Sequence, residues 1–323
     1  MQSLKKKQTR RERFLNHLDQ LLPWNELLEL THPHYQKMNG KGRQSISLAV
    51  MLKIHIAQIV YNHSDLGMGD ALYEVDSLRH FAGIGLNEVP DETTILRFRH
   101  LLEKHELAAA LFVKINETLS ARGFFLKTGT IVDASLIAAP TPTKNKLSAR
   151  DPDMHSSKKG NMWHFGGKVH IGVDSETGLT HSIVFTSGNV SDINEVVHLL
   201  QGEETCLQGD AGYLCIDKRE EIQATQLKQF AIAKRPGQLK KIKNTSGITA
   251  RPLIDLLLDV EHELASRRAK VEHVFRDLKI RFGYAKVRYR GLIKNASRFK
   301  LLAAISNVLR ANSYECRKGL IAP

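Results

Sequence analysis

The chain has 323 residues, which is enough for two domains, and 42% hydrophobic residues, which is enough for a substantial core. Its formal charge of +13 favours a polyanionic partner such as nucleic acid, although ribosomal and other simply basic proteins share this property. The most apolar stretch, residues 46–61, is interrupted by polar side chains and is too short to span a bilayer. Three cysteines without paired spacing indicate a reducing compartment, so we expect a soluble, cytoplasmic protein.

The positive charge is unevenly distributed. It is concentrated in residues 1–13, 234–243 and 267–300, whereas residues 14–120 contain more acids than bases. We therefore expect residues 1–13 to form a basic arm and the two later segments to line a channel for phosphates.

Residues 14–125 are expected to form an all-helical domain that serves DNA-end binding, dimerisation or both. Apolar residues recur there at helical spacing, in segments separated by Gly- and Pro-containing turns. The predicted helices cover residues 14–30 with a break at Pro23, 45–62, 65–81, a helix starting within 90–94, and 106–122. Ser45 or Ser47 is the predicted N-cap of the second of these.

Residues 126–315 are expected to form an α/β domain. Short β-branched segments predict five strands, at residues 128–137, 164–174, 180–187, 205–210 and 229–233. The remaining segments predict a long polar loop over 140–161, helices over 192–200, 217–225, 252–282 and 296–311, and a basic loop over 234–251. This order of elements is that of an RNase H-like fold, a mixed five-stranded sheet with flanking helices.

Three carboxylates stand out in this domain. Asp133 lies inside the first predicted strand and Asp210 ends the fourth, and these two strands are neighbours in such a sheet. A single Asp of this kind is more often an edge or hydrogen-bonded residue, because burying an unpaired charge is costly. Glu272 lies on the polar face of the helix over 252–282, where an i,i+4 ion pair with Arg268 is the ordinary interpretation. The occurrence of all three on separate elements favours a metal site for phosphoryl transfer.

Oxygen ligands of this kind favour Mg²⁺ or Mn²⁺ over zinc. Two such ions can stabilise both the attacking and the leaving oxygen of an in-line displacement. The cations Arg268, Arg276 and Lys279 surround Glu272 on the helix and could hold DNA phosphates. The sequence contains neither the Cys/His spacing of a zinc site nor a phosphate-binding GxxxxGK[ST] loop, so zinc and ATP are not expected.

Five co-linear segments carry a family resemblance. They are VPDETTILRFR (89–99), VDASLIAAP (132–140), WHFGGKVHIGVD (163–174), GDAGY (209–213) and VEHVFR (271–276). These segments resemble the bacterial insertion-sequence transposases of the DDE type, most closely the insertion-sequence-five family. The resemblance implies an RNase H-like catalytic domain whose triad maps onto Asp133, Asp210 and Glu272. Ala265 stands where that family carries a tyrosine, so the role of that tyrosine is unfilled here.

We therefore expect a transposase that binds the terminal inverted repeats of its element, cleaves DNA and joins the 3′-hydroxyl ends to target DNA. It is expected to act as a homodimer or larger assembly, at the bacterial nucleoid. Further DNA contacts are expected from the basic residues Lys234, Arg235, Lys240, Lys241, Arg288 and Arg290. A nuclease of the same fold that never joins ends, and a catalytically silent DNA-binding regulator, remain alternatives.

Several other residues receive ordinary interpretations. Trp163 is assigned to the core in preference to a base-stacking role, and Asp174 and Asp192 are assigned to a turn and a helix cap. The lysines of the long loop can either contact DNA or form a solvated surface; they are Lys144, Lys146, Lys158 and Lys159.

Overall fold

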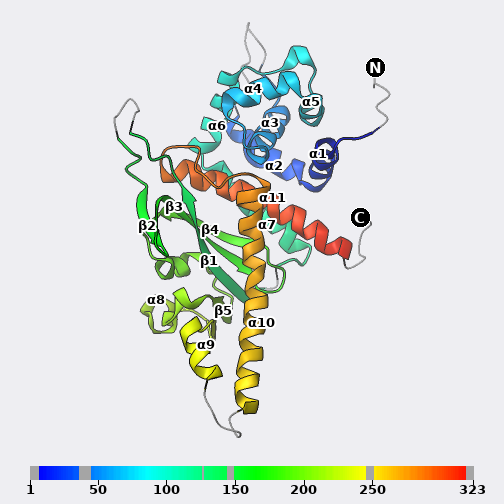
Figure 1. The fold of residues 1–323 in the computed structure, drawn as a ribbon. Coiled ribbons are helices and arrows are strands. Elements are labelled where there is room, and N and C mark those ends of the chain that lie inside the picture. Colours follow the sequence, from blue (N-terminus) through cyan, green and yellow to red (C-terminus); the bar gives the residue numbers. More distant parts are fainter. Residues whose placement is uncertain (1–6, 36–44, 126, 144–148, 245–250, 318–323) are drawn as a thin grey trace. The chain divides into compact units, whose positions relative to one another are not determined.

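The structure, a computed structural model, describes residues 7–35, 45–125, 127–143, 149–244 and 251–317 (Figure 1). The chain divides into two compact units. We call residues 1–121 and 300–323 the helical unit, and residues 122–299 the sheet unit. Some segments discussed above lie outside the described residues. They are the start of the basic arm, much of the segment 32–43 between two predicted helices, Lys144, Lys146 and part of the basic loop.

The helical unit contains helices in every segment predicted to be helical in the N-terminal half, although the segment over 65–81 forms two helices and not one. They are α1 (Arg10–Leu21), α2 (Trp24–Thr31), α3 (Leu48–Val60), α4 (Asp65–Glu74), α5 (Asp76–Ala82), α6 (Glu92–Lys104) and α7 (Leu107–Ala121). Side-chain caps explain where several begin, because Ser47, Ser64 and Asp91 accept hydrogen bonds from orphan backbone N–H groups of α3, α4 and α6. Within the described part of the chain, residues 10–13, which were assigned to the basic arm, are helical. They form the first turn of α1, which Thr9 and Glu12 close with a capping box.

A buried arginine ties two of these helices together. Arg99 of α6 is 7% exposed, and its guanidinium lies 2.8 Å from the Asp65 carboxylate of α4. Glu103, one turn further along α6, pairs with the same guanidinium, and Gln58 of α3 donates to Asp65. Since a buried charge is tolerated only when it is paired, this network explains a charged residue in an otherwise apolar position.

The sheet unit is built on a mixed six-stranded sheet. Its strands are β1 (Gly129–Ala138), β2 (His155–Lys159), β3 (Met162–Asp174), β4 (Thr180–Ser187), β5 (Cys206–Gly209) and β6 (Gln229–Ile232). The hydrogen-bonded order is β2-β3-β1-β5-β6, and β4 also pairs with β3. β3 runs antiparallel to both β1 and β4, whereas β5 is parallel to β1 and β6 is parallel to β5. Five of the six strands are those predicted.

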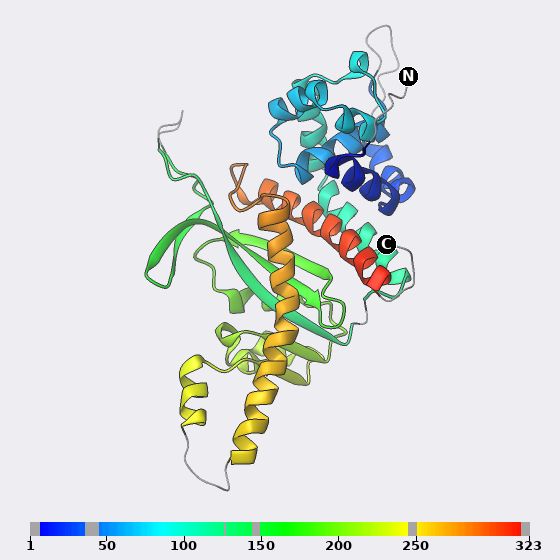
Figure 2. The ribbon, with the colours of Figure 1, turned by 45° about the vertical axis from the view of Figure 1, so that its right-hand side comes forward.

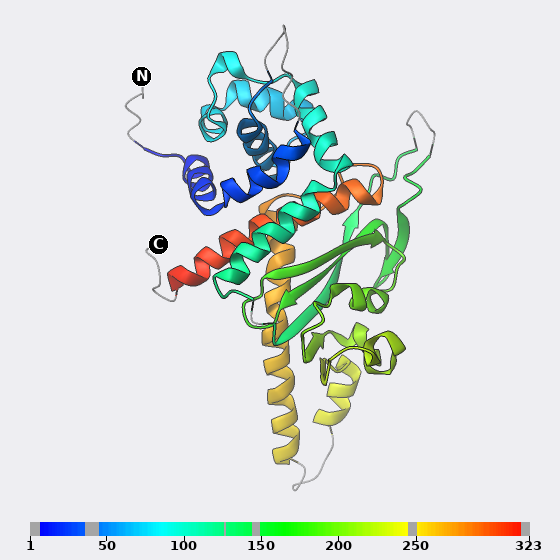
Figure 3. The same cartoon turned by 180° about the vertical axis from the view of Figure 1, so that it is seen from behind.

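Helices cover both faces of the sheet. The long helix α10 (Arg251–Arg276) contacts β1, β3 and β5 and crosses the sheet in Figures 1 and 2. The 3₁₀ helix η3 (Asp192–Leu199) contacts β1, β3 and β4, and Figure 3 shows it on the opposite face. There Val196 and Leu199 form an apolar cluster with Val132 of β1 and Leu207 of β5. The alternation of side chains along β1 therefore directs Val132 toward η3 and Asp133 toward α10.

Several of the remaining elements differ from the predictions. The prediction of a structureless loop over 140–161 was wrong at its end, because β2 pairs with β3 there and makes six strands instead of five. The basic loop contains a helix, α9 (Pro236–Lys243), which starts with proline at a favourable first-turn position. The single helix predicted over 252–282 is α10 followed by a π-helical turn, η7 (Asp277–Arg281). The segment over 217–225 forms only short helices, η5 (Ile216–Lys218) and α8 (Glu220–Gln223).

The last helix, α11 (Leu292–Arg317), is longer than predicted and contributes residues to both units. In the part of the chain that the structure describes, no helix combines the length and apolar character needed to cross a membrane.

Asn295 of α11 is expected to be a stability determinant of the sheet unit. It is fully buried, accepts a hydrogen bond from the Tyr284 hydroxyl at 2.5 Å, and donates to the carbonyls of Tyr289 and Gly291. Asn295→Ala should lower the free energy of unfolding by about 2 to 4 kcal/mol, because it leaves several buried polar groups without partners.

Urea unfolding followed by circular dichroism would measure this loss. Asn194→Ala is the matched control, since Asn194 is exposed and its side chain accepts a hydrogen bond from Arg219 at the surface. An equal effect of both substitutions would contradict the assignment.

Candidate functional site

The parallel pairing of β1 and β5 brings two of the predicted carboxylates together. Ile131 of β1 is paired with Gln208 of β5, so continuing this register by two residues places Asp133 opposite Asp210. Asp133 lies in the middle of β1, and Asp210 directly follows the last residue of β5. The two side chains also interact electrostatically.

Local structure fixes the orientation of Asp210. The chain turns after β5 into a short 3₁₀ helix, η4 (Ala211–Tyr213), and Asp210 is its N-cap. Its Oδ1 accepts a hydrogen bond from the Gly212 N–H at 2.8 Å. Tyr213 packs so closely beneath the turn that a Cβ on Gly209 would lie 2.9 Å from its ring. The sequence Gly-Asp-Ala-Gly-Tyr thus builds the turn that presents this carboxylate.

Asp133 titrates far from its ordinary range. Its pKa is raised from 3.8 to about 6, chiefly by burial and in addition by the neighbouring negative charges of Asp210 and Asp192. The Ala134 N–H, which donates to Oδ1 at 2.7 Å, and the positive charge of Arg268 partly oppose this rise. Burial and the two neighbouring carboxylates therefore stabilise the protonated form of Asp133 relative to that of an exposed aspartate. A pKa perturbed in this way is common among catalytic carboxylates.

Glu272 is placed differently. It lies on the exposed side of α10, and the charges that shift the pKa of Asp133 do not include it. Among the described residues, no three His, Cys, Asp or Glu side chains come close enough together to hold a metal ion. The structure thus brings Asp133 and Asp210 together, and does not gather Glu272 with them.

The cations predicted on the same helix occupy three different environments. Arg268 is half-buried and acts on Asp133. Lys279 lies in the π-helical turn and donates from Nζ to the Ser135 hydroxyl at 2.6 Å and to the Leu136 carbonyl at 2.8 Å. Burial and the charge of Lys159 lower its pKa. Arg276 is exposed at the end of α10.

The predicted DNA-contacting residues of the basic loop also differ in their surroundings. Lys234 is engaged within the protein, because its Nζ lies 2.7 Å from Glu261 of α10 and its backbone N–H donates to the same carboxylate. Arg235, Lys240 and Lys241 are exposed at the start and on the surface of α9.

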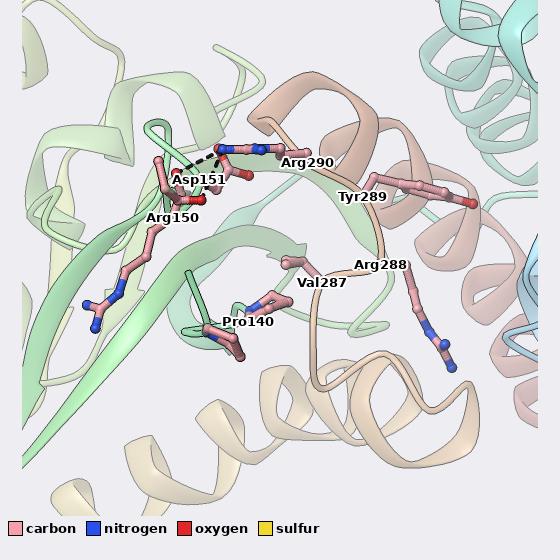
Figure 4. Close-up of a pocket in the computed structure, with 9 residues that line it drawn as sticks. Pro140, Arg150, Asp151, Val287, Arg288, Tyr289 and Arg290 are labelled. Atoms are coloured by element: carbon pink, nitrogen blue, oxygen red, sulfur yellow. Dashed lines mark hydrogen bonds between the residues drawn. The ribbon is translucent and has the colours of Figure 1, made fainter. Parts of the chain in front are cut away.

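Arg288 and Arg290 line a cavity of about 270 Å³ in the sheet unit. Its wall consists of the segment after β1 and the segment before α11 (Figure 4). The Arg290 guanidinium donates to the carbonyls of Ala149 and Arg150, whereas Arg150 and Arg288 extend away from the cavity on different sides. Arg290 therefore holds this wall together, and Arg288 has an exposed side chain.

Sequence reasoning missed three features of this region. Asp192 does not cap η3 as predicted; it forms an ion pair with Lys168 at 2.9 Å and acts electrostatically on Asp133. Asp174 does hold a turn, accepting from the backbone of Glu176 and Thr177. The core assignment of Trp163 was wrong, since its side chain is 70% exposed.

The third missed feature is the hydroxyl of Tyr213. Its own burial, and then the charges of the nearby Asp133, Asp192 and Asp210, raise its pKa. It lacks a hydrogen-bond partner in the described part of the chain. Its position in the motif Gly-Asp-Ala-Gly-Tyr was the available signal.

The donor set at Asp133 and Asp210 fits a hard divalent cation. Both groups are carboxylates, and Mg²⁺ commonly binds one or two carboxylates and completes its shell with water and substrate phosphates. The raised pKa of Asp133 and the unpartnered Tyr213 hydroxyl show a site that lacks compensating positive charge and hydrogen bonds. The residues present therefore fit Mg²⁺ or Mn²⁺ as ligands from two strands.

Comparisons with known proteins show the family of the chain. Residues 125–308 match the family described as "Transposase DDE domain", and residues 2–101 match the family described as "Transposase domain (DUF772)". The chain therefore belongs to the transposase DDE domain family. A cryo-electron microscopy structure of the piggyBac transposase synaptic complex with hairpin DNA is similar with 10% identity and a TM-score of 0.45, over 94% of this chain and 76% of that one.

The ionisation of Asp133 predicts a pH-dependent stability. Its folded-state pKa of about 6 exceeds the ordinary 3.8, so the folded protein holds the proton to a higher pH than the unfolded chain does. The contribution of Asp133 to stability should therefore fall as the pH rises from about 4 to about 6. Asp133→Asn, which mimics the neutral form, should stabilise the protein at pH 7.5 by about 1 to 2 kcal/mol after allowance for partial exposure.

Thermal unfolding without divalent ions at pH 4 and pH 7.5 would test this expectation. The gain should disappear at pH 4, and Asp255→Asn, on the exposed surface of α10, should show no comparable pH dependence. Destabilisation by Asp133→Asn at pH 7.5 would show that the carboxylate is stabilising in its ionised form.

Proposed function

We propose that this protein is a DNA transposase that binds the terminal inverted repeats of an insertion sequence, cleaves DNA by metal-activated hydrolysis and joins the 3′-hydroxyl ends to target DNA. The observation that carries this proposal is the paired position of Asp133 and Asp210 on adjacent parallel strands, in a chain of the transposase DDE domain family. The order β4-β3-β1-β5-β6 within the sheet supports an RNase H-like assignment of the sheet unit.

Asp133 and Asp210 would hold the metal ions, and Glu272 would complete the catalytic triad. Two bound divalent ions would supply a nucleophilic water and charge stabilisation for an in-line displacement. Glu272 and Arg268 are one helical turn apart on α10, and the charge of Arg268 acts on Asp133, so a movement of this polar face toward β1 would bring the glutamate nearer to the pair. Substrate phosphate and metal would supply the attraction for such a shift.

Arg268 is placed to balance the charge at the pair, and Lys279 positions β1 beside it. Their positive charges, together with those of Arg276 and Arg288, would face the DNA backbone. The exposed Arg235, Lys240 and Lys241 of α9 would extend the same basic surface. Lys234 and Arg290 would act indirectly, since their side chains hold Glu261 and the wall of the cavity.

We assign end binding, dimerisation or both to residues 14–125. The excess of acids over bases in this segment favours dimerisation over DNA contact, and two DNA ends must be handled together. The insertion-sequence-five branch and a bacterial, nucleoid-associated location are part of the same proposal.

Substitution of the paired carboxylates should abolish DNA cleavage. With candidate terminal repeats and Mg²⁺, Asp133→Asn and Asp210→Asn should each lower the rate of strand cleavage by roughly 10³-fold or more, because each removes a ligand of the ions that stabilise the transition state. Glu272→Gln should lower it by at least about 10²-fold if Glu272 joins the pair in the DNA complex. Strand-specific cleavage on denaturing gels is the measurement.

Glu263→Gln is the matched control for Glu272, since Glu263 is an exposed acid of the same helix that pairs with Arg267 at 3.0 Å. Unchanged Mg²⁺-dependent strand transfer by Asp133→Asn would refute the proposal. A supercoiled target plasmid and labelled 3′-hydroxyl ends separate the alternatives: cleavage without joined products indicates a nuclease, and binding without cleavage indicates a regulator.

A further inference from the structure

The β2–β3 hairpin exposes two large apolar side chains at its end. Trp163 is 70% exposed and Met162 is 66% exposed. The register of the two strands places Lys158 opposite Trp163 and Lys159 opposite Met162. An exposed indole forgoes a large part of the free energy that its burial would contribute, so a contact with a partner is the natural explanation.

Trp163 lies on the same face of the sheet as the candidate catalytic pair. Side chains alternate along β3, and Trp163 is eight residues from Ile171, which is paired with Asp133. An even separation keeps Trp163, its partner Lys158 and Asp133 on one face. Eight residues of strand span at most about 26 Å. This length corresponds to about seven or eight nucleotides at 3.4 Å each.

The charge around the tip suits DNA. Lys158 and Lys159 are exposed, and residues 155–165 contain no acid. Lys159 also lowers the pKa of Lys279, which is anchored to β1 beside the pair, so positive charge continues from the tip to the site. At the base of the hairpin, the Arg150 guanidinium lies 5.2 Å from the ring centre of Phe165, which is on the Trp163 face.

We propose that the β2–β3 hairpin is a DNA contact in which Trp163 stacks on an unpaired base and Lys158 and Lys159 hold the adjoining phosphates. This inference rests on the proposed function for the identity of its polymer. An unpaired base is favoured because an indole needs a free base face, which a base inside a duplex does not offer. Stacking of this kind tolerates any base, so the contact would not depend on the sequence of the DNA end.

The chain allows a direct test, since Trp24 and Trp163 are its two tryptophans. Trp24 is half-buried in the helical unit and donates to the Asp19 carbonyl, so Trp24→Phe leaves Trp163 as the only indole. Its emission should be quenched by a metal-free DNA duplex that ends in unpaired thymines, and much less by a blunt duplex of the same length. Stacking also predicts that Trp163→Ala weakens binding of the forked duplex by roughly 5- to 100-fold, with little change for the blunt duplex.

Two variants separate stacking from charge and from misfolding. Trp163→Phe keeps an aromatic face and should retain most of the preference for forked DNA. The double substitution Lys158→Ala and Lys159→Ala should weaken the binding of both duplexes and reduce its salt dependence. The quenching of Trp163 emission at saturation should persist. Circular dichroism would show that each variant keeps its fold.

The inference is overturned if the emission of the single-tryptophan variant responds equally to forked and blunt DNA, or if Trp163→Ala binds forked DNA as the parent does. Because these measurements use no metal and no cleavage, their failure is distinguishable from failure of the proposed function. Cleavage that requires Asp133 without a response of Trp163 would remove only this inference. A response of Trp163 without cleavage under any condition would remove only the proposed reaction.

Discussion

The parallel pairing of β1 and β5 is the constraint on which the site depends. It places Asp133 and Asp210 on neighbouring strands, where the charge of Asp210 adds to burial in raising the pKa of Asp133. The protein opposes this only in part, with one backbone N–H at each carboxylate and with the charge of Arg268. The fold therefore concentrates negative charge at one point of the sheet and leaves its neutralisation to ligands.

Helix α10 and the turn after it supply the opposing charge. The residues that α10 buries lie mainly near its C-terminal end, at Val271, Val274 and Phe275, so the helix is held against the sheet there. The π-helical turn η7 then inserts an extra residue per turn, which rotates the following side chains relative to an α-helix. Lys279 reaches β1 from this turn, and its two hydrogen bonds fix the turn to the strand that carries Asp133.

Most of the fold could be predicted because its signals are local. Apolar periodicity predicted the N-terminal helices, and β-branched runs predicted five strands. β2 could not be found in this way, because His-Ser-Ser-Lys-Lys has no apolar alternation and its strand is held by pairing with β3 alone. The helix α9 was hidden by its basic composition, although Pro236 at its start was a usable signal.

The candidate site was also predictable only in part. Neighbouring strands in a predicted topology were enough to bring Asp133 and Asp210 together, since register follows from backbone pairing. The face of a helix is also predictable, but its distance from a sheet depends on packing, and Glu272 therefore could not be placed. Trp163 was assigned to the core because bulky aromatic residues usually are buried. The sequence does not show that this residue lies near the end of the β2–β3 hairpin, where its side chain is exposed.

Several features of the sheet unit run against stability, and they share one explanation. Asp133 is held where its charge is disfavoured, the Tyr213 hydroxyl is buried beside three acids without a partner among the described residues, and Trp163 is exposed. Ordinary core packing would remove each of these costs, for example by a neutral residue at position 133. A polyanion with divalent cations addresses the first and the last of these, because the cations neutralise the carboxylates and a base can cover the indole, and the same cations offset the negative charge around Tyr213. The pattern of unfavourable local choices thus follows the path that the DNA is proposed to take, from the paired carboxylates along β3 to the end of the hairpin.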